Sequence, residues 1–224
     1  LEPRVQGLQP AAASRRFPSF LAPAMTQLPE LPLTLSRQEI RKMIRQRRRA
    51  LTPEQQQEMG QQAATRMMTY PPVVMAHTVA VFLSFDGELD TQPLIEQLWR
   101  AGKRVYLPVL HPFSAGNLLF LNYHPQSELV MNRLKIHEPK LDVRDVLPLS
   151  RLDVLITPLV AFDEYGQRLG MGGGFYDRTL QNWQHYKTQP VGYAHDCQLV
   201  EKLPVEEWDI PLPAVVTPSK VWEW

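Results

Sequence analysis

The sequence has little cysteine, no excess of either charge and no long apolar run. One cysteine, Cys197, occurs among 224 residues, which excludes an intrachain disulfide and a multi-cysteine metal site and favours a reducing, cytoplasmic setting. The 24 basic and 23 acidic residues leave a formal net charge of +1, so bulk charge does not draw this chain to nucleic acid or a membrane surface. No stretch approaches the roughly 18 uninterrupted apolar residues of a spanning helix.

The first 35 residues differ from the rest of the chain. Prolines stand at 3, 10, 18, 23, 29 and 32, and no apolar periodicity is sustained. We expect residues 1–35 to be a disordered leader or a segment added for expression, with Met25 as a possible natural start. A targeting peptide is the alternative, but prolines interrupt its short apolar patch. Residues 36–224 are then a single α/β domain.

Two helices open this domain. Ser36 and Glu39 form a capping box, in which each side chain satisfies the backbone N–H of the other residue. Thr52, Pro53 and Gln55 have the same arrangement with proline at the first helical position. The second helix is expected to end near Tyr70, where two prolines follow.

From residue 78 onward, short apolar stretches alternate with helical ones. A helix is expected at 91–101, closed by Gly102, and another after the glycines at 170–174. Strands are expected at 78–84, 104–110, 118–123 (antiparallel), 152–157, 190–194 and 214–217. This alternation predicts an α/β fold with a mostly parallel sheet covered on both faces.

A run of glycines gives the densest functional signal. Glycines at 170, 172, 173 and 174 let several backbone N–H groups turn toward one phosphate. Phe175 excludes a dinucleotide fingerprint, and no Gly-Lys-Ser/Thr follows; a tight structural turn is the alternative. Arg168 and Arg178 can hold phosphate oxygens, Tyr176 can donate a hydrogen bond, and Asp177 can bind magnesium.

The first helix is strongly basic. Positions 37, 41, 45 and 48 carry arginines that share one face, and the favoured interpretation is a solvated face. An RNA-binding arm is a second interpretation, although no RNA-binding motif accompanies it. In a third, Arg37 and Arg41 reach the phosphates of a nucleotide.

Three further groups carry possible chemistry. Glu88 follows a predicted sheet strand and can accept hydrogen bonds from an amino-substituted heterocycle, whereas Asp90 or Thr91 is expected to cap the next helix. Asp209 is a second metal ligand or, by spacing alone, a simple loop carboxylate. Cys197 is expected to be structural despite the nearby His195, and the histidines lack metal-binding spacing.

In combination, these segments resemble the 5-formyltetrahydrofolate cyclo-ligase family. The basic first helix, residues 82–91, residues 102–108 and residues 158–178 carry the resemblance. It implies a three-layer α/β/α sandwich with a mostly parallel, mixed central sheet. It also implies ATP-dependent cyclisation of 5-formyltetrahydrofolate to 5,10-methenyltetrahydrofolate, with release of ADP and phosphate and a requirement for Mg²⁺.

The resemblance assigns roles residue by residue. The catalytic residues are Arg168 and Tyr176. The nucleotide-binding residues are Arg37, Arg41, Arg168, Leu169, Gly170, Met171, Gly172, Gly173, Gly174, Phe175 and Tyr176. The folate-binding residues are Leu83, Glu88, Met171, Gly172, Gly173, Gly174 and Phe175. The magnesium ligands are Asp177 and Asp209. Relatives can carry Lys at Arg37 and Gly173 and Tyr at Phe175, so one charge and one hydroxyl are absent from this loop.

Two other classes of function stay open at this point. One is a different nucleotide-dependent small-molecule kinase or ligase, and the other is a non-catalytic folate- or RNA-binding protein. We expect a cytoplasmic monomer whose partner is a small-molecule folate, with neither nucleic acid nor a membrane.

Overall fold

The computed structural model describes residues 35–224. The expectation about residues 1–35 therefore lies outside the described residues, except at Leu35. Among the residues described, no helix has the length and apolar character needed to cross a membrane.

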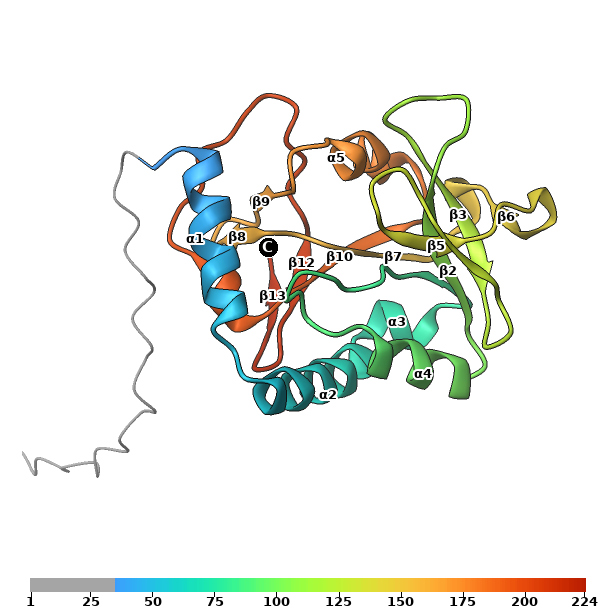
Figure 1. The fold of residues 1–224 in the computed structure, drawn as a ribbon, viewed down its shortest axis with the longest axis horizontal. Helices are drawn as coiled ribbons and strands as arrows, with labels where there is room; N and C mark the ends of the chain where they lie inside the picture. Colours follow the sequence, from blue (N-terminus) through green and yellow to red (C-terminus); the bar gives the residue numbers. More distant parts are fainter. Residues whose placement is uncertain (1–34) are drawn as a thin grey trace, which may run out of the picture.

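An eight-stranded sheet forms the centre of the molecule (Figure 1). Its order is β13 (Val221–Glu223), β12 (Ala214–Val216), β10 (Gln189–Tyr193), β7 (Val154–Thr157), β1 (Thr78–Ala80), β2 (Arg104–Leu110), β3 (Leu118–Tyr123) and β6 (Val146–Leu147). The strands from β12 to β2 pair in parallel, and the flanking strands β13, β3 and β6 are antiparallel. The predicted mixed, mostly parallel sheet is confirmed.

The helices lie around this sheet. Their bounds are α1 (Arg37–Arg49), α2 (Pro53–Thr69), α3 (Pro71–Met75), α4 (Gln92–Arg100) and α5 (Phe175–Leu180), with short 3-10 helices η1 (Val143–Asp145), η2 (Leu149–Arg151), η3 (Trp183–His185) and η4 (Asp196–Gln198). Helices α2, α3 and α4 cover one face, below the sheet in Figure 1, and α5 lies on the opposite side. Layers on both faces of the sheet are the expected sandwich.

Two small sheets complete the fold. One contains β11 (Leu199–Val200), β8 (Ala161–Asp163) and β9 (Arg168–Leu169), and the other is the hairpin of β4 (Leu129–Met131) and β5 (His137–Pro139). Helix α1 stands beside β8 and β9 (Figure 1). Strand β9 leads into residues 170–174, and β5 carries His137 and Glu138; these residues line the pocket described below.

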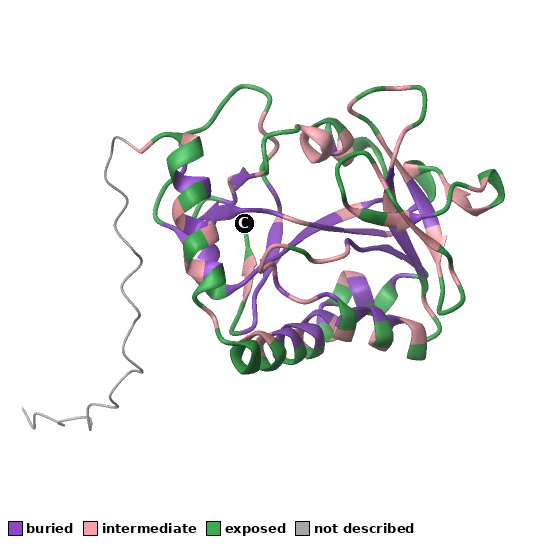
Figure 2. Ribbon diagram, viewed as in Figure 1, coloured by how far each residue is buried: buried purple, intermediate pink, exposed green. Residues whose placement is uncertain are grey.

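The strand period of two divides the core between the faces of the central sheet. Val79 packs in the cluster that contains α2 and α4 residues, whereas its neighbour Ala80 packs in the cluster that contains Leu180 of α5. Successive side chains of a strand point to opposite faces, so a sheet buried on both sides reads as a nearly continuous apolar run. Figure 2 shows that the inner strands are buried over most of their length.

The predicted helix starts are confirmed at atomic level. Ser36 Oγ accepts from Glu39 N at 3.2 Å, and Ser36 N donates to the Glu39 carboxylate at 3.1 Å. Thr52 and Gln55 make the same reciprocal pair. Leu35 packs against the cluster containing Ile40, which completes a hydrophobic staple across the first turn.

Several sequence boundaries were wrong. The strand expected at 78–84 ends at Ala80, although Val81 N still donates to Tyr106 O at 2.9 Å. Beyond this bond the chain leaves the sheet, and Phe82, Leu83, Phe85 and Glu88 line the pocket. The prolines at 71 and 72 end α2 as expected, but they also begin α3. The strands of two or three residues in the small sheets were missed because so few residues show no periodicity.

Candidate active site

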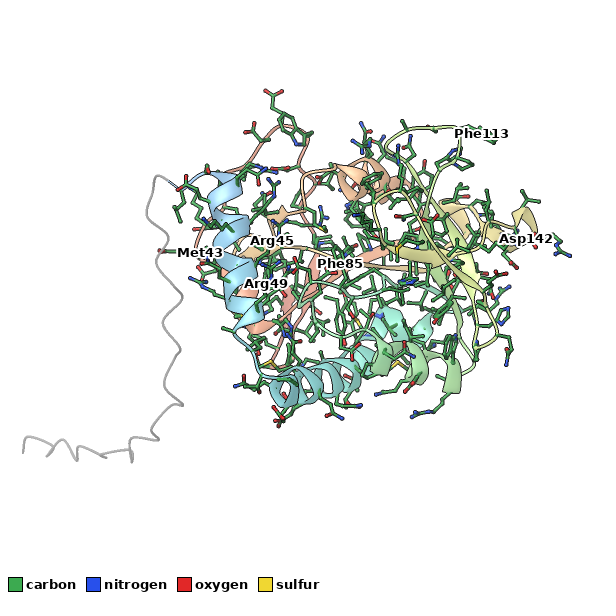
Figure 3. The ribbon with its side chains drawn as sticks, in the orientation of Figure 1. Met43, Arg45, Arg49, Phe85, Phe113 and Asp142 are labelled. Carbon is green, nitrogen blue, oxygen red and sulfur yellow. The ribbon has the colours of Figure 1, made fainter. Side chains whose placement is uncertain are left out.

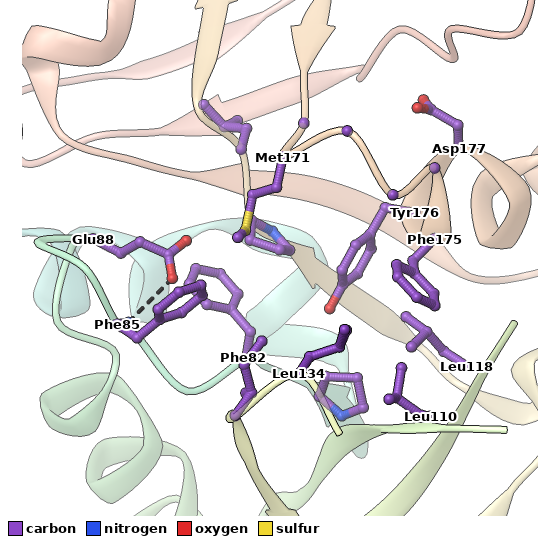
Figure 4. A pocket seen from close by; sticks show the side chains of 18 of the residues that line it. Phe82, Phe85, Glu88, Leu110, Leu118, Leu134, Met171, Phe175, Tyr176 and Asp177 are labelled. Atoms are coloured by element: carbon purple, nitrogen blue, oxygen red, sulfur yellow. Dashed lines mark hydrogen bonds between the residues drawn. The ribbon is translucent and has the colours of Figure 1, made fainter. Parts of the chain in front are cut away.

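A pocket of about 670 Å³ opens where the parallel strands end. Phe82 and Leu83 follow β1, and Pro158 and Leu159 follow β7, so the pocket lies beyond the carboxyl ends of the sheet strands. Ligands of open α/β sheets bind at this edge. Figure 4 shows side chains that line this pocket, among them Phe82, Glu88 and Tyr176.

The glycine run forms one wall of the pocket. Residues 170 and 172–174 line it on the way from β9 to α5. Gly174 occupies the N-cap of α5 with φ +71°, a left-handed conformation that a side chain disfavours. The glycines thus expose backbone groups to the pocket, as a phosphate cradle requires.

Arg168 lies buried beneath this loop. Its Nε donates to Pro158 O at 2.9 Å, and its Nη1 lies 3.6 Å from Asp177 Oδ1. Its guanidinium carbon is 5.5 Å from the centre of the Tyr176 ring. Burial lowers the pKa of Arg168, and the charges of Asp177 and Tyr176 oppose this effect. An arginine keeps its proton in proteins, so the pocket holds a buried cation whose counter-ion, Asp177, lies 3.6 Å away.

The N-terminal half of α1 brings two more arginines to the same wall. Arg41 is buried and donates from Nε to Gly170 O at 2.7 Å. Arg37 makes a two-pronged pair with Asp209, at 2.6 Å and 3.1 Å, and also donates to Pro204 O. Burial lowers the pKa of Arg41, with further lowering by the neighbouring Arg37. Residues far apart in sequence therefore gather three guanidinium groups at the glycine run.

The interpretation of α1 as a solvated basic face was wrong. Arg41 and Arg48 are buried, and Arg45, Arg48 and Arg49 all lie within 4.0 Å of the Asp86 carboxylate. Figure 3 shows Arg45 and Arg49 on α1. The face packs on protein because the loop after β1 supplies the acidic partner.

That loop also holds Glu88 and Leu83 in the pocket. The Glu88 carboxylate accepts from Phe85 N at 3.1 Å, the bond drawn in Figure 4. Burial raises the pKa of Glu88 to about 7, opposed by the Phe85 bond and by the charge of Arg48. Asp90 stands one residue before Thr91, the N-cap of α4, and its carboxylate accepts from Gln92 N at 3.0 Å, whereas the Thr91 side chain makes no capping bond. Thr91 instead donates its hydroxyl to Phe82 O at 2.6 Å.

Tyr176 points its ring into the pocket (Figure 4). Burial raises the pKa of its hydroxyl above the ordinary value, and only part of this is offset by Arg168. The hydroxyl therefore stays protonated at neutral pH and can donate a hydrogen bond. Phe175 lies beside Leu118 and Leu110 in the same view.

The apolar half of the pocket was mostly missed by sequence reasoning. Its walls come from the loop after β1, from β2 and β3, and from the β4–β5 hairpin; they include Phe82, Phe85, Leu107, Pro108, Leu110, Leu118, Asn132, Leu134, Ile136 and His137. Apolar residues at strand ends resemble core residues in a sequence, so only their position beside the Glu88 loop could have marked them. Trp208, whose residue surface is 63% exposed, also lines the pocket.

Three predicted residues lie elsewhere than expected. Leu169 is fully buried in the cluster beside α1 and does not line the pocket. Asp209 is absent from the lining and is held by Arg37 and by Glu206 N. Arg178, suggested as a phosphate ligand, donates instead to the backbone carbonyls of Gly116 and Gly173.

Asp177 lines the pocket and accepts from Ile210 N at 3.2 Å. Among residues 35–224, no group of three or more His, Cys, Asp or Glu side chains is arranged to hold a metal ion. Magnesium commonly uses one or two carboxylates together with substrate phosphates, and Asp177 beside the glycine run fits that pattern.

The His195–Cys197 segment lies outside the pocket lining. The His195 ring Nε2 lies 3.2 Å from Gly87 O, which ties this segment to the Glu88 loop. Burial lowers the pKa of His195 to about 4 and raises the pKa of the Cys197 thiol. Because the thiolate is the nucleophilic form, this supports the structural role expected for Cys197.

Comparisons with known proteins agree on one family. The family described as the 5-formyltetrahydrofolate cyclo-ligase family matches residues 34–218. The chain is 53% identical over 179 residues to the 5-formyltetrahydrofolate cyclo-ligase of Haemophilus influenzae, covering 80% of this chain and 96% of that protein.

Solved structures give the same result. The fold is similar to the NMR structure of Aquifex aeolicus 5,10-methenyltetrahydrofolate synthetase, with a TM-score of 0.72 and 28% identity, over 84% of this chain and 93% of that one. A 5,10-methenyltetrahydrofolate synthetase from Mycoplasma pneumoniae, at 20% identity and a TM-score of 0.64 over 82% of this chain and 99% of that one, has the same fold.

Proposed function

We propose that ATP and 5-formyltetrahydrofolate both bind in the pocket described above. This chain belongs to the 5-formyltetrahydrofolate cyclo-ligase family. It is a ligase that converts 5-formyltetrahydrofolate to 5,10-methenyltetrahydrofolate with ATP. One observation carries this proposal. Buried Arg168 and Arg41 meet the glycine run on one wall, while the facing walls are largely apolar. The pocket thus combines a site for a polyanion with a site for a flat heterocycle.

The nucleotide occupies the charged wall in this proposal. Arg37, Arg41 and Arg168 bind its phosphates together with the backbone of residues 170–174. Arg41 supports this role because its Nε is bonded to Gly170 O, which leaves its terminal amino groups to reach a phosphate. Leu169 contributes only its backbone, since its side chain is buried in the core.

The folate occupies the apolar walls. Leu83 and Phe175 contact its rings, and Glu88 accepts hydrogen bonds from its amino groups. An ionised Glu88 is the stronger acceptor, so its pKa of about 7 ties folate affinity to pH. Phe175 offers a ring face without a hydroxyl at the position where relatives can carry Tyr.

Magnesium is proposed to arrive with the nucleotide. Asp177 would hold it, and Asp209 would assist only after its pair with Arg37 rearranges. When bound, the ion would neutralise charge on the phosphates.

The chemistry needs positioning more than covalent help from the protein. The γ-phosphoryl group of ATP passes to the formyl oxygen on N5, breaking its bond to ADP. N10 then attacks the activated formyl carbon and loses its proton, and phosphate leaves with the former formyl oxygen. Arg168 stabilises the charge on the transferred phosphoryl group, and the protonated Tyr176 hydroxyl donates to the same reacting oxygens. Both residues line the pocket, and the Arg168 guanidinium carbon lies 5.5 Å from the centre of the Tyr176 ring, which supports a shared role.

The test is formation of the conjugated methenyl product, followed by its near-ultraviolet absorbance, from 5-formyltetrahydrofolate and Mg-ATP. Arg168→Ala should lower kcat by about 100-fold or more, as expected for loss of a donor to developing charge. The matched control is Arg104→Ala, since Arg104 is exposed and outside the pocket lining. Wild-type turnover in a folded Arg168→Ala variant would refute this assignment. Release of ADP without the absorbance change would instead indicate a small-molecule kinase.

The cytoplasmic location, the monomeric state and the absence of a nucleic-acid partner stay predictions from the sequence. RNA binding that weakens as the salt concentration rises, together with no ATP turnover, would favour an RNA-binding protein instead.

A further inference from the structure

Arg178 lies behind the glycine run and outside the pocket lining. Its Nε donates to Gly116 O at 2.6 Å, and its Nη2 donates to Gly173 O at 2.5 Å. Its guanidinium carbon lies 5.4 Å from the centre of the Phe175 ring. One side chain therefore connects two backbone segments that are more than fifty residues apart in the sequence.

The two segments belong to different halves of the site. Gly173 is part of the glycine run assigned to the nucleotide. Gly116 lies in the turn between β2 and β3, and the residues that flank this turn, Leu110 and Leu118, line the apolar half. Hydrogen bonds from His111 and Asn117 hold the turn together internally, whereas Arg178 ties it to the nucleotide loop.

The close fit around the guanidinium supports a specific link. A Cβ added at Gly174 would lie 2.6 Å from Arg178 Nη1, and one added at Gly116 would lie 2.8 Å from Nη2. Gly116 has φ +82°, so the turn presents its carbonyl in a conformation that favours glycine. The missing side chains of Gly116 and Gly174 therefore leave room for the guanidinium.

We propose that Arg178 is a positioning residue that fixes the nucleotide loop relative to the folate wall, so that the γ-phosphoryl group and the formyl oxygen are held in register. This inference rests on the proposed function. The geometry requires two donors on separate nitrogens, a fork that lysine lacks. In-line phosphoryl transfer depends strongly on such registration.

The first readout needs no turnover. Hydrogen exchange of the ligand-free protein should show faster exchange at residues 170–174 and 111–117 in Arg178→Ala than in wild type. The control Arg100→Ala removes an exposed arginine of α4 and should leave both segments unchanged. Unchanged exchange at both segments in Arg178→Ala would overturn the link even if the enzyme assay failed.

The second readout is kinetic. Arg178→Ala should raise the KM for ATP about 10-fold, which corresponds to about 1.4 kcal/mol, and should lower kcat as well. Arg178→Lys should behave like the alanine variant. Recovery of the wild-type KM and kcat by lysine would show that charge alone suffices, and would overturn the bridging role.

A double-variant comparison isolates the bridge from general loop damage. Gly116→Ala should raise the ATP KM by a similar factor, and adding Arg178→Ala should cause little further change, since both substitutions break one link. Gly102→Ala is the matched control, because Gly102 has φ +75° but nothing within 4 Å of its added Cβ. The proposal would be refuted if the KM increases of the two single variants multiplied in the double variant, or if Gly102→Ala raised the ATP KM by an equal factor. Loss of product formation in wild type would refute the proposed function alone.

Discussion

Glu88→Gln tests the electrostatics of the folate wall without removing the side chain. Glu88 accepts from Phe85 N, and a glutamine oxygen can accept the same bond. Burial moves the pKa of the carboxyl group from 4.5 to about 7. A change of this size means that ionised Glu88 lowers the free energy of unfolding by about 3 kcal/mol relative to protonated Glu88.

The sign follows from proton binding. Between pH 4.5 and 7 the folded state binds more protons at Glu88 than the unfolded state does, so the wild type loses stability as pH rises through this window. Glutamine is neutral throughout and lacks this dependence. The variant should therefore be more stable than wild type at pH 8, by up to about 3 kcal/mol, and the difference should shrink toward pH 4.5.

Urea unfolding followed by tryptophan fluorescence at pH 4.5 and pH 8 measures this difference. Glu201→Gln is the control, because Glu201 is exposed and its replacement should change stability little at either pH. The folate KM of Glu88→Gln should rise at pH 8, where the charged acceptor is lost. A stability difference that is equal at both pH values, or a less stable variant at pH 8, would refute the reasoning about burial.

Three other predictions use the same assays. Tyr176→Phe should lower kcat by about 10-fold with little change in either KM, since one hydrogen bond to a charged group is worth about 1.5–3 kcal/mol; unchanged kcat would exclude a role for the hydroxyl. Asp177→Asn should raise the magnesium concentration needed for half-maximal activity by about 10-fold, and an unaltered requirement would remove Asp177 as a ligand. Because the pKa of His195 is lowered to about 4, the free energy of unfolding decreases as pH falls from 6.5 toward 4. His195→Gln should therefore flatten the acid side of the melting-temperature profile, and an unchanged acid slope would contradict neutral burial.

The sequence predicted features that are encoded locally. The capping boxes at Ser36 and Thr52 fixed two helix starts, and buried strands such as β7 were visible as apolar runs. The glycine run and its flanking Arg168 do line the pocket, and they could be singled out because residues of distinctive chemistry stand together there; their roles stay predictions. The helix starts and the buried strands were predictable because each depends on one short segment of sequence.

Features that depend on distant partners were not predicted. The pair between Arg37 and Asp209 joins positions 172 residues apart. The orientation of the Arg178 side chain depends on Gly116 in the turn between β2 and β3, whose carbonyl accepts its hydrogen bond. The β4–β5 hairpin, which supplies Leu134 to the pocket, has strands too short for a period. In each case tertiary packing decides the outcome, and local propensity carries no information about it.

The basic helix shows how a nearly neutral chain can bind polyanions. Its C-terminal arginines are balanced by Asp86 and its first arginine by Asp209. Arg41 is different, because within residues 35–224 it forms no ion pair and is bonded to a carbonyl. Burying a cation costs free energy unless an anion pairs with it. In this pocket a bound ligand would supply that anion. Net charge therefore matters less here than which cation the fold leaves unbalanced beside the glycine run.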